Sequence, residues 1–157
     1  MSETFMEAGT TDSLGLDQVA DVVSRACSRE NYRGKRVLLI VPDSTRTAPV
    51  GALFQALHRQ ISGVTRALDV LVALGTHQPM SEEAICQRLE ITEGERRQTY
   101  AGVRFFNHSW NDPAALTQVG VLSSEAVSEL TGGLFAMDVP VEVNRMIFDY
   151  DQVIIAG

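Results

Sequence analysis

The chain has 157 residues, 45% of them hydrophobic, which suits one domain with a sizeable core and is too short for two ordinary domains. Its net charge of -7, from 13 basic and 20 acidic residues, excludes a broad basic surface for a nucleic-acid partner. Residues 1–11 contain acidic side chains and no apolar run, so we expect neither a signal peptide nor membrane insertion, and we predict a cytoplasmic protein.

The first third of the chain predicts a helix, a buried strand and a second helix. After a flexible segment over 1–15, apolar residues recur at helical spacing and indicate a helix over 17–29. The run VLLIV at 37–41 is typical of a strand that is buried on both faces of a parallel sheet. Pro49 suits the first turn of the next helix, which we expect to stop near Ser62.

The same alternation is expected to continue along the chain. Further strands are predicted at 70–74, 103–107, 117–122, 139–143 and 153–155. Ser81 is a helix-capping residue, Thr92 and Glu95 have capping-box spacing, and 124–130 has a helical pattern. Alternating strands and helices predict an α/β fold, with a mainly parallel sheet flanked by helices on both faces, in a Rossmann-like three-layer domain over 16–157.

Three polar segments directly follow predicted strands: DSTR at 43–46, GTHQ at 75–78 and NHSW at 107–110. The carboxyl ends of parallel strands meet at one edge of the sheet, where ligands bind in open α/β folds, so we expect all three segments to face one crevice. An arginine, two histidines, several hydroxyls and helix N-termini would together suit a carboxylate or phosphate. The sequence therefore predicts a small anionic ligand.

Arg46 has two interpretations from its position alone. It can clamp a carboxylate or phosphate, because a guanidinium is permanently charged and offers paired donors. It can instead form an ion pair with Asp43 that stiffens the turn. The spacing favours neither, because Asp43, Ser44 and Thr45 are also ordinary turn and helix-capping residues.

The three histidines carry different expectations. His77 can act as a general acid or base, since an imidazole exchanges protons near neutral pH and Gly75 lets the backbone approach a ligand; a loop-bracing role is slightly favoured for a histidine considered alone. We expect His108 to lock the neighbouring loop beneath Trp110 rather than to act in catalysis. His58 is predicted to be exposed and is given no function.

Several other chemistries lack support in the sequence. No Gly-rich loop follows the first strand, which disfavours a nicotinamide-dependent dehydrogenase, and no serine lies in a nucleophile-elbow pattern. The histidines and the two cysteines, Cys27 and Cys86, do not have the spacing of a metal site or a redox pair. We therefore expect no metal site within this chain and two buried free thiols.

Three segments, in this order, resemble motifs of the lactate racemase family. VPDSTRTAP at 41–49 resembles D-x-T-R-x-x-P, ALGTHQPMSEE at 73–83 is similar to A-L-G-T-H-R-x-M-x-x-E, and NHSW at 107–110 resembles N-H-D-W. The similarity continues through 139–144 and 151–157, so it covers most of this chain but under half of a full-length family member.

The resemblance implies an N-terminal, substrate- and cofactor-facing domain of a 2-hydroxy-acid racemase or epimerase that uses a nickel-pincer nucleotide. It implies acid/base catalysis by His77 and substrate contacts from Arg46 and Thr76. The residues that it implies for cofactor contact are Asp43, Ser44, Thr45 and Arg46. In the family mechanism a histidine removes the hydroxyl proton while a hydride passes from the substrate carbon to the pincer ring, and the flat keto acid takes the hydride back on its other face.

The family's second histidine, its cofactor-tethering lysine and its nickel-ligating histidine lie beyond the last residue of this chain. The resemblance thus implies a missing C-terminal part as partner, and we expect the chain alone to be inactive and to retain no tightly bound cofactor. Gln78 stands where the family has arginine, and Ser109 where N-H-D-W has its acid. The reaction class is therefore predicted, and the particular 2-hydroxy acid is not.

Two alternative hypotheses remain open at this point. The first is a stand-alone domain that binds a small organic acid or phosphate without catalysis, and it predicts that Arg46→Ala lowers ligand affinity. The second is a structural domain whose loops are only caps and ion pairs, and it predicts changes in stability without any change in binding.

Overall fold

The computed structural model describes residues 15–157, which form two compact units. The first comprises 15–108 and 149–157, and the second comprises 109–148. The predicted flexible segment 1–15 lies, except for Gly15, outside the described residues. The expectation of a single domain over 16–157 stays a prediction; each unit is described below by itself.

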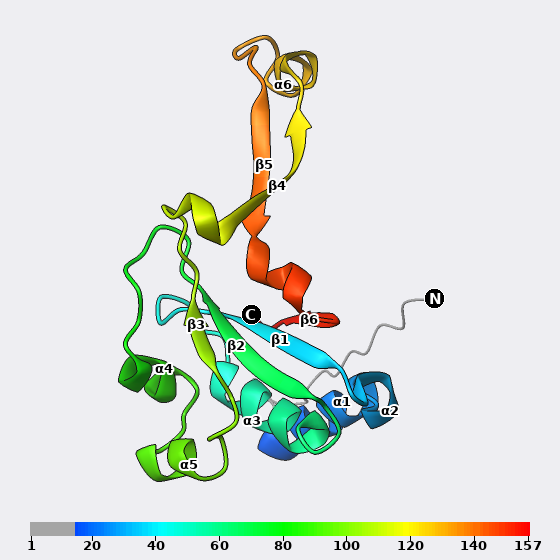
Figure 1. The fold of residues 1–157 in the computed structure, drawn as a ribbon, viewed down its shortest axis with the longest axis vertical. Helices are drawn as coiled ribbons and strands as arrows, with labels where there is room; N and C mark the ends of the chain where they lie inside the picture. The colour runs from blue at the N-terminus through cyan, green and yellow to red at the C-terminus, as the bar shows by residue number, and fades with distance from the viewer. Residues whose placement is uncertain (1–14) are drawn as a thin grey trace. The chain divides into compact units, whose positions relative to one another are not determined.

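The first unit is built on a four-stranded parallel sheet (Figure 1). Its strands are β1 (Arg36–Pro42), β2 (Ala67–Ala73), β3 (Phe105–Asn107) and β6 (Gln152–Ile155), in the spatial order β3-β2-β1-β6. All three neighbouring pairs are parallel. The predicted α/β class, with a mainly parallel sheet flanked by helices, is thereby confirmed.

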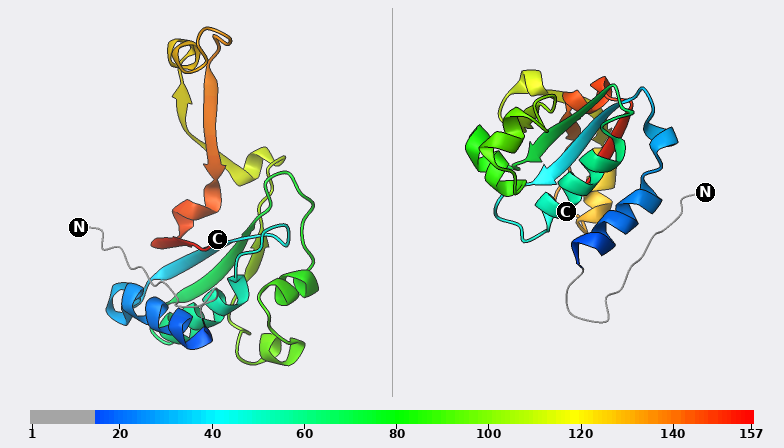
Figure 2. Two further views of the ribbon diagram at one scale, coloured as in Figure 1. Left: turned by 180° about the vertical axis from the view of Figure 1, so that it is seen from behind. Right: turned by 90° about the horizontal axis from the view of Figure 1, so that it is seen from below.

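Five helices accompany this sheet, and Figures 1 and 2 show α1 and α3 on the same side of it. They are α1 (Leu16–Ala26), α2 (Arg29–Tyr32), α3 (Val50–Ile61), α4 (Glu82–Arg88) and α5 (Glu93–Arg97). Alternate residues of β1, including Leu39, pack with Phe54 of α3 and Ile85 of α4 in one buried cluster. Burial of each such side chain contributes roughly 1.5–3 kcal/mol of stability. These helices therefore pack against one face of the sheet and form one of the two helical layers that the three-layer prediction requires.

The predicted helix starts after Ser81 and Thr92 are confirmed. The backbone N–H of Ala84 donates to Ser81 Oγ at 3.1 Å. Thr92 and Glu95 form the predicted capping box, in which each side chain accepts from the other residue's backbone N–H. These bonds satisfy donors that a helix leaves unpaired in its first turn, which is why the short α4 and α5 begin where they do.

The second unit is an antiparallel pair of strands, β4 (Leu116–Leu122) and β5 (Val139–Asn144), with α6 (Ser124–Leu130) in the connection between them. The predicted strands and helix are present, but this pair departs from the parallel alternation that their order suggested. Gly132 and Gly133 follow α6 with φ of 63° and 85°, a conformation that glycine adopts without strain and that ends the helix. The chain then returns beside β4 as a hairpin. Two short 3-10 helices, η1 (Pro113–Ala115) and η2 (Arg145–Asp149), flank the pair.

Two predicted elements differ in detail from the structure. The predicted first helix over 17–29 is two helices, because α1 ends at Ala26 and α2 begins at Arg29. The strand predicted as buried at 153–155 is an edge strand, with Val153 41% and Ile155 78% exposed. An apolar run alone did not distinguish an edge from the centre of the sheet. None of the helices within 15–157 has the length and apolar character needed to cross a bilayer.

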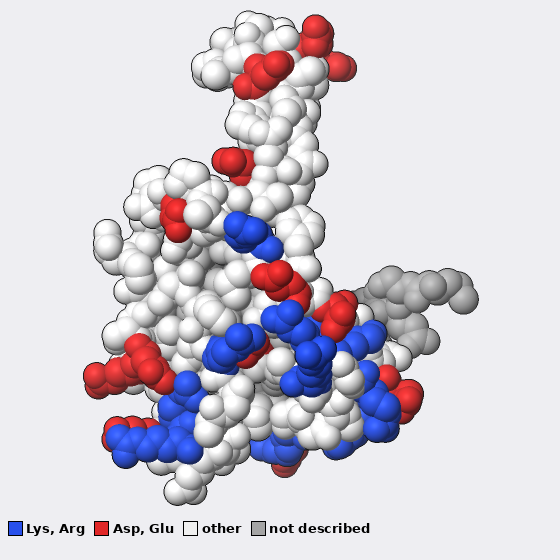
Figure 3. All heavy atoms as spheres, in the orientation of Figure 1, with Lys and Arg blue, Asp and Glu red and all other residues white. Residues whose placement is uncertain are grey.

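Charge is unevenly distributed between the units. Residues 109–148 contain five acidic residues and one basic residue, Arg145, so the other 12 of the 13 Lys and Arg residues lie outside the second unit. Figure 3 shows blue spheres over both the sheet and the helices of the first unit.

Candidate functional site

The ends of β1 and β2 bring the first two predicted polar segments together. Pro42 pairs with Ala73 at the last register position of the two strands, so residues 43–46 and 75–78 leave the sheet side by side. His77 Nδ1 lies 2.5 Å from Asp43 Oδ2, a hydrogen bond between residues 34 positions apart. The two loops therefore lie together as predicted, and the hydrogen bond between Asp43 and His77 joins them.

Asp43 is the buried member of this pair, with 6% of its surface exposed. Its Oδ1 accepts hydrogen bonds from the Thr45 backbone N–H at 3.1 Å and from Thr45 Oγ1 at 2.5 Å. These bonds and the bond to His77 outweigh burial and lower the pKa of Asp43 to about 2. Asp43 is thus an ionised, acceptor-only carboxylate throughout the physiological pH range.

His77 is the accessible member, with 57% of its side chain exposed. Its backbone N–H donates to the Leu74 carbonyl at 3.0 Å, and this tight turn is possible because Gly75 has a φ of +58°. Because ionised Asp43 can only accept, it favours the neutral tautomer that carries the proton on Nδ1. Nε2 then carries the lone pair of a potential base.

Arg46 does not form the ion pair with Asp43 that was one of its two interpretations. Its backbone N–H donates to the Asp43 carbonyl at 3.4 Å, but within 15–157 its exposed side chain has no hydrogen bond or ion pair. Arg46 lines a hollow of about 650 Å³ beside the end of β1. A charged, unengaged guanidinium at a strand end can bind an anion.

The remaining predicted site residues have different surroundings. Ser44 and Thr76 are exposed in the same two loops. The backbone N–H of His108 donates to the Val72 carbonyl at 3.0 Å, so His108 continues the pairing beside β2. Trp110 belongs to the second unit and is 48% exposed. The predicted locking of the loop by His108 beneath Trp110 stays a prediction.

Asn107 braces the loop that carries His77, a role the sequence did not suggest. Its Oδ1 accepts from the Met80 N–H at 3.1 Å, and its Nδ2 donates to the Met80 carbonyl at 2.9 Å. This paired contact mimics a strand pairing and fixes the backbone between His77 and α4. The position of Asn107 at the end of the third predicted strand was the available signal.

Arg88 is a second residue that the sequence did not single out. Its Nε donates to the Pro42 carbonyl at 3.2 Å, directly before Asp43 in the chain. In sequence, an arginine in the last turn of a helix indicates only a favourable interaction with the helix dipole. The contact across 46 residues becomes visible only in three dimensions.

The prediction that His58 is exposed is wrong. Its ring lies 4.7 Å from the ring of Tyr100 and 6.0 Å from that of Phe54, and burial lowers its pKa. The aromatic neighbours explain why this histidine packs inward. Cys86 is buried as predicted, and Cys27 is partly buried with its sulfur accepting from the Tyr32 hydroxyl at 3.6 Å.

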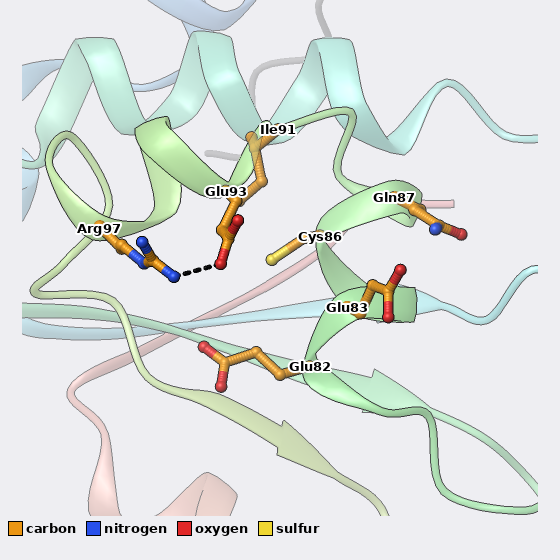
Figure 4. A pocket seen from close by; sticks show the side chains of 7 residues that line it. All are labelled: Glu82, Glu83, Cys86, Gln87, Ile91, Glu93 and Arg97. Atoms are coloured by element: carbon orange, nitrogen blue, oxygen red, sulfur yellow. Dashed lines mark hydrogen bonds and ion pairs between the residues drawn. The ribbon is translucent and has the colours of Figure 1, made fainter.

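A hollow of about 690 Å³ lies between α4 and α5, but it contains none of the predicted site residues (Figure 4). Its lining is Glu82, Glu83, Cys86, Gln87, Ile91, Glu93 and Arg97. The one cation in it, Arg97, is already paired with Glu93. Three carboxylates make this hollow unsuitable for an organic acid. Across 15–157 no group of three or more His, Cys, Asp or Glu residues is arranged to hold a metal ion.

The fold and the loop geometry define an α/β domain whose polar pair lies at the carboxyl edge of a parallel sheet. The chain matches the family described as "Lactate racemase N-terminal domain" over residues 21–157 and belongs to that family. It is similar to a solved protein from Thermotoga maritima, at 31% identity and a TM-score of 0.79. That match covers 92% of this chain and 34% of the solved one, so the chain spans about a third of its structural relative. No curated protein matches the chain.

Proposed function

We propose that this chain is the substrate- and cofactor-facing domain of a lactate racemase-like isomerase that inverts a 2-hydroxy acid. The observation that carries the proposal is the hydrogen bond between buried Asp43 and half-exposed His77 at the sheet edge. The membership of the chain in the lactate racemase N-terminal domain family supports the reaction class.

His77 is the acid/base residue of this proposal. With Nδ1 bonded to Asp43, its Nε2 takes the proton of the substrate hydroxyl, and the ionised Asp43 stabilises the imidazolium that results. Returning the same proton to the keto oxygen restores the hydroxyl group, while the inversion itself takes place at the carbon. A buried carboxylate that is ionised in advance does not have to reorganise when the charge develops.

Arg46 and Thr76 bind the substrate in this proposal. The exposed guanidinium of Arg46 pairs with the substrate carboxylate, and the Thr76 hydroxyl lies in the same loop as His77. A bidentate guanidinium–carboxylate pair fixes the plane of the acid group and leaves C2 free to turn about its bond to the carboxylate. Inversion requires such an anchor, because the carbon must present both faces while the carboxylate stays bound.

The residues assigned to the cofactor fit a nickel-pincer nucleotide in their chemistry. Ser44 and Arg46 offer an exposed hydroxyl and an unengaged cation, which suit the anionic parts of a nucleotide, while Asp43 and Thr45 hold the turn that presents them. When bound, the cofactor would supply the acceptor for a hydride from the substrate carbon. The missing C-terminal part would provide the remaining contacts.

Calorimetry on this chain tests the substrate-binding half of the proposal. We expect (R)- and (S)-lactate and related 2-hydroxy acids to bind weakly, and Arg46→Met to reduce the affinity by about tenfold or more through the loss of a charge-assisted pair. Arg33→Met removes another exposed arginine, directly after α2, and is the matched control. Equal affinities of the wild type and Arg46→Met would contradict the assignment of Arg46.

Turnover by the longer protein that includes this domain, prepared with its cofactor, tests the catalytic half. With a substrate deuterated at C2, hydride transfer retains the label during inversion, and His77→Gln lowers kcat by about 10²–10⁴-fold. Loss of the label to solvent would contradict the mechanism. Binding that depends on Arg46, without any turnover, would instead favour the alternative of a small-anion binding domain, which the unengaged guanidinium also suits.

A further inference from the structure

We propose that Arg88 is a positioning residue, which sets the Asp43–His77 geometry by joining the end of β1 to the end of α4. The inference concerns the residues of the proposed active site, so its relevance to catalysis rests on the proposed function. The structural part of the claim does not, because the pairing of Asp43 and His77 can be observed without substrate or cofactor.

Arg88 lies between the two segments whose side chains pair. Its Nε donates to the carbonyl of Pro42, the last residue of β1 and the residue before Asp43. Arg88 is itself the last residue of α4, and the loop that precedes α4 carries His77. One side chain thus links the backbone next to Asp43 to the helix that follows His77.

The end of α4 is itself firmly held, which makes Arg88 a fixed reference point. Gln55 of α3 donates to the carbonyls of Leu89 and Glu90, at 3.2 and 3.0 Å, directly after α4. Leu89 is fully buried in the main apolar cluster. These contacts hold the backbone of Arg88 in place. The bond from Arg88 to Pro42 therefore restrains the start of the 43–46 turn rather than the position of α4.

The guanidinium of Arg88 is only partly hydrogen-bonded, which is unusual for a side chain whose role is packing alone. Its Nη2 is buried and has no hydrogen-bond partner among the described residues. A buried donor without a partner is costly, so an apolar residue would suit packing better at this position. The structure assigns one bond to this side chain, the Nε–H donated to the Pro42 carbonyl, and that bond acts on the residue before Asp43.

The tautomer of His77 reports directly on this geometry. In the wild type, Asp43 accepts from Nδ1, which favours the Nδ1–H form; a histidine without that partner favours the Nε2–H form. Two-bond ¹H–¹⁵N spectra of the chain, at a pH where the ring is neutral, distinguish the two tautomers. For Arg88→Met we expect the ratio of Nδ1–H to Nε2–H to fall about tenfold, the scale of one hydrogen bond.

Arg145→Met is the matched control, because Arg145 also donates to a backbone carbonyl, that of Ala114 at 3.2 Å, but within the second unit. It should lose stability and keep the wild-type tautomer ratio, whereas Asp43→Asn should lose the Nδ1–H preference. Arg88→Lys keeps a charged donor and should retain the wild-type ratio if it reaches Pro42.

A wild-type ratio in folded Arg88→Met would overturn the proposal. If that variant does not fold, Arg88→Lys decides the question together with the ¹³C shift of the Pro42 carbonyl, which reports whether the bond to residue 88 is kept. A wild-type ratio without that bond, or a collapsed ratio with it, would overturn the proposal, and a ratio that follows the bond supports it. Failure of the proposed function would look different: the tautomer ratio would respond to Arg88 as expected, while the longer protein would show no turnover of any 2-hydroxy acid.

Discussion

The parallel sheet carries a buried aspartate near each of its two ends, and the two are satisfied in opposite ways. Asp69, in β2 near its amino end, is fully buried and accepts from the Arg104 guanidinium at 2.6 Å, the Arg104 N–H at 3.0 Å and the Tyr150 hydroxyl at 2.8 Å. Asp43, at the carboxyl end of β1, is 6% exposed and shares its oxygens between Thr45 and half-exposed His77.

The difference separates a structural carboxylate from a candidate functional one. Burial raises the pKa of Asp69, but the hydrogen bonds from Arg104 and Tyr150 outweigh it and lower the pKa. None of these partners is a group that exchanges protons near neutral pH. The partner of Asp43 is an imidazole that is accessible to solvent. The charge of Asp43 can therefore stabilise a positive charge that forms on this imidazole when it takes a proton from a bound ligand.

The largest expected effect is the loss of stability when Asp69 is removed. Asp69→Ala leaves the Arg104 backbone N–H and the Tyr150 hydroxyl without their acceptor, while the exposed Arg104 guanidinium can bond to water, and it should lower the free energy of unfolding by about 2–3 kcal/mol. Asp43→Ala should cost only about 1 kcal/mol, because Thr45 and His77 can bond to water instead. Urea unfolding followed by far-UV circular dichroism measures both. Equal losses of stability in Asp69→Ala and Asp43→Ala would contradict the distinction between a structural and a functional carboxylate.

A smaller effect is expected in the pH dependence of the free energy of unfolding at acid pH, and Asp43 is its source. Because its pKa in the folded state is lowered to about 2 from 3.8, its stabilisation is complete above pH 4 and is lost as the pH falls through 2. Discounted for the solvent around half-exposed His77, the shift corresponds to about 1 kcal/mol. The stability difference between the wild type and Asp43→Asn should therefore shrink between pH 5 and pH 2. A difference that is independent of pH would show that Asp43 is not held as an anion.

Much of the first unit is predictable from the sequence because its signals are local. The apolar run of β1, Pro49 before α3, and the capping residues Ser81 and Thr92 each act within a few residues of themselves. The loops after β1 and β2 could also be placed at one edge, because the strand ends of a parallel sheet are neighbours.

The pairings within the site were not predictable in the same way. The partner of Asp43 is His77 and not Arg46, a choice that depends on the register of β1 against β2 and on the turn at Gly75. Arg88 binds a backbone carbonyl, which has no side-chain signature in sequence. The antiparallel pairing of β4 with β5 was missed because an apolar pattern does not encode the direction of a neighbouring strand.

The smallest expected effect concerns the turn that brings His77 to Asp43. A Cβ at Gly75 would meet nothing within 4 Å, so the cost of Gly75→Ala is the backbone strain of its φ of +58°, about 1 kcal/mol. Gly102→Ala is the matched control, because that Cβ also meets nothing and the φ of Gly102 is not positive. It should be neutral or slightly stabilising in thermal unfolding.

The two alanine variants also separate strain from function. If relief of the strain in Gly75→Ala shifts the turn, His77 moves away from Asp43, and the stabilisation that depends on the Asp43 charge should shrink. Adding Asp43→Asn to each alanine background, and comparing stabilities between pH 5 and pH 2, measures that stabilisation. In the Gly102→Ala background it should stay at the wild-type value. Gly75→Ala could instead lose stability while the pH-dependent stabilisation by Asp43 stays unchanged. That result would mean that the backbone adjusts at another residue of the turn and that the Asp43–His77 bond is stronger than the backbone preference at residue 75.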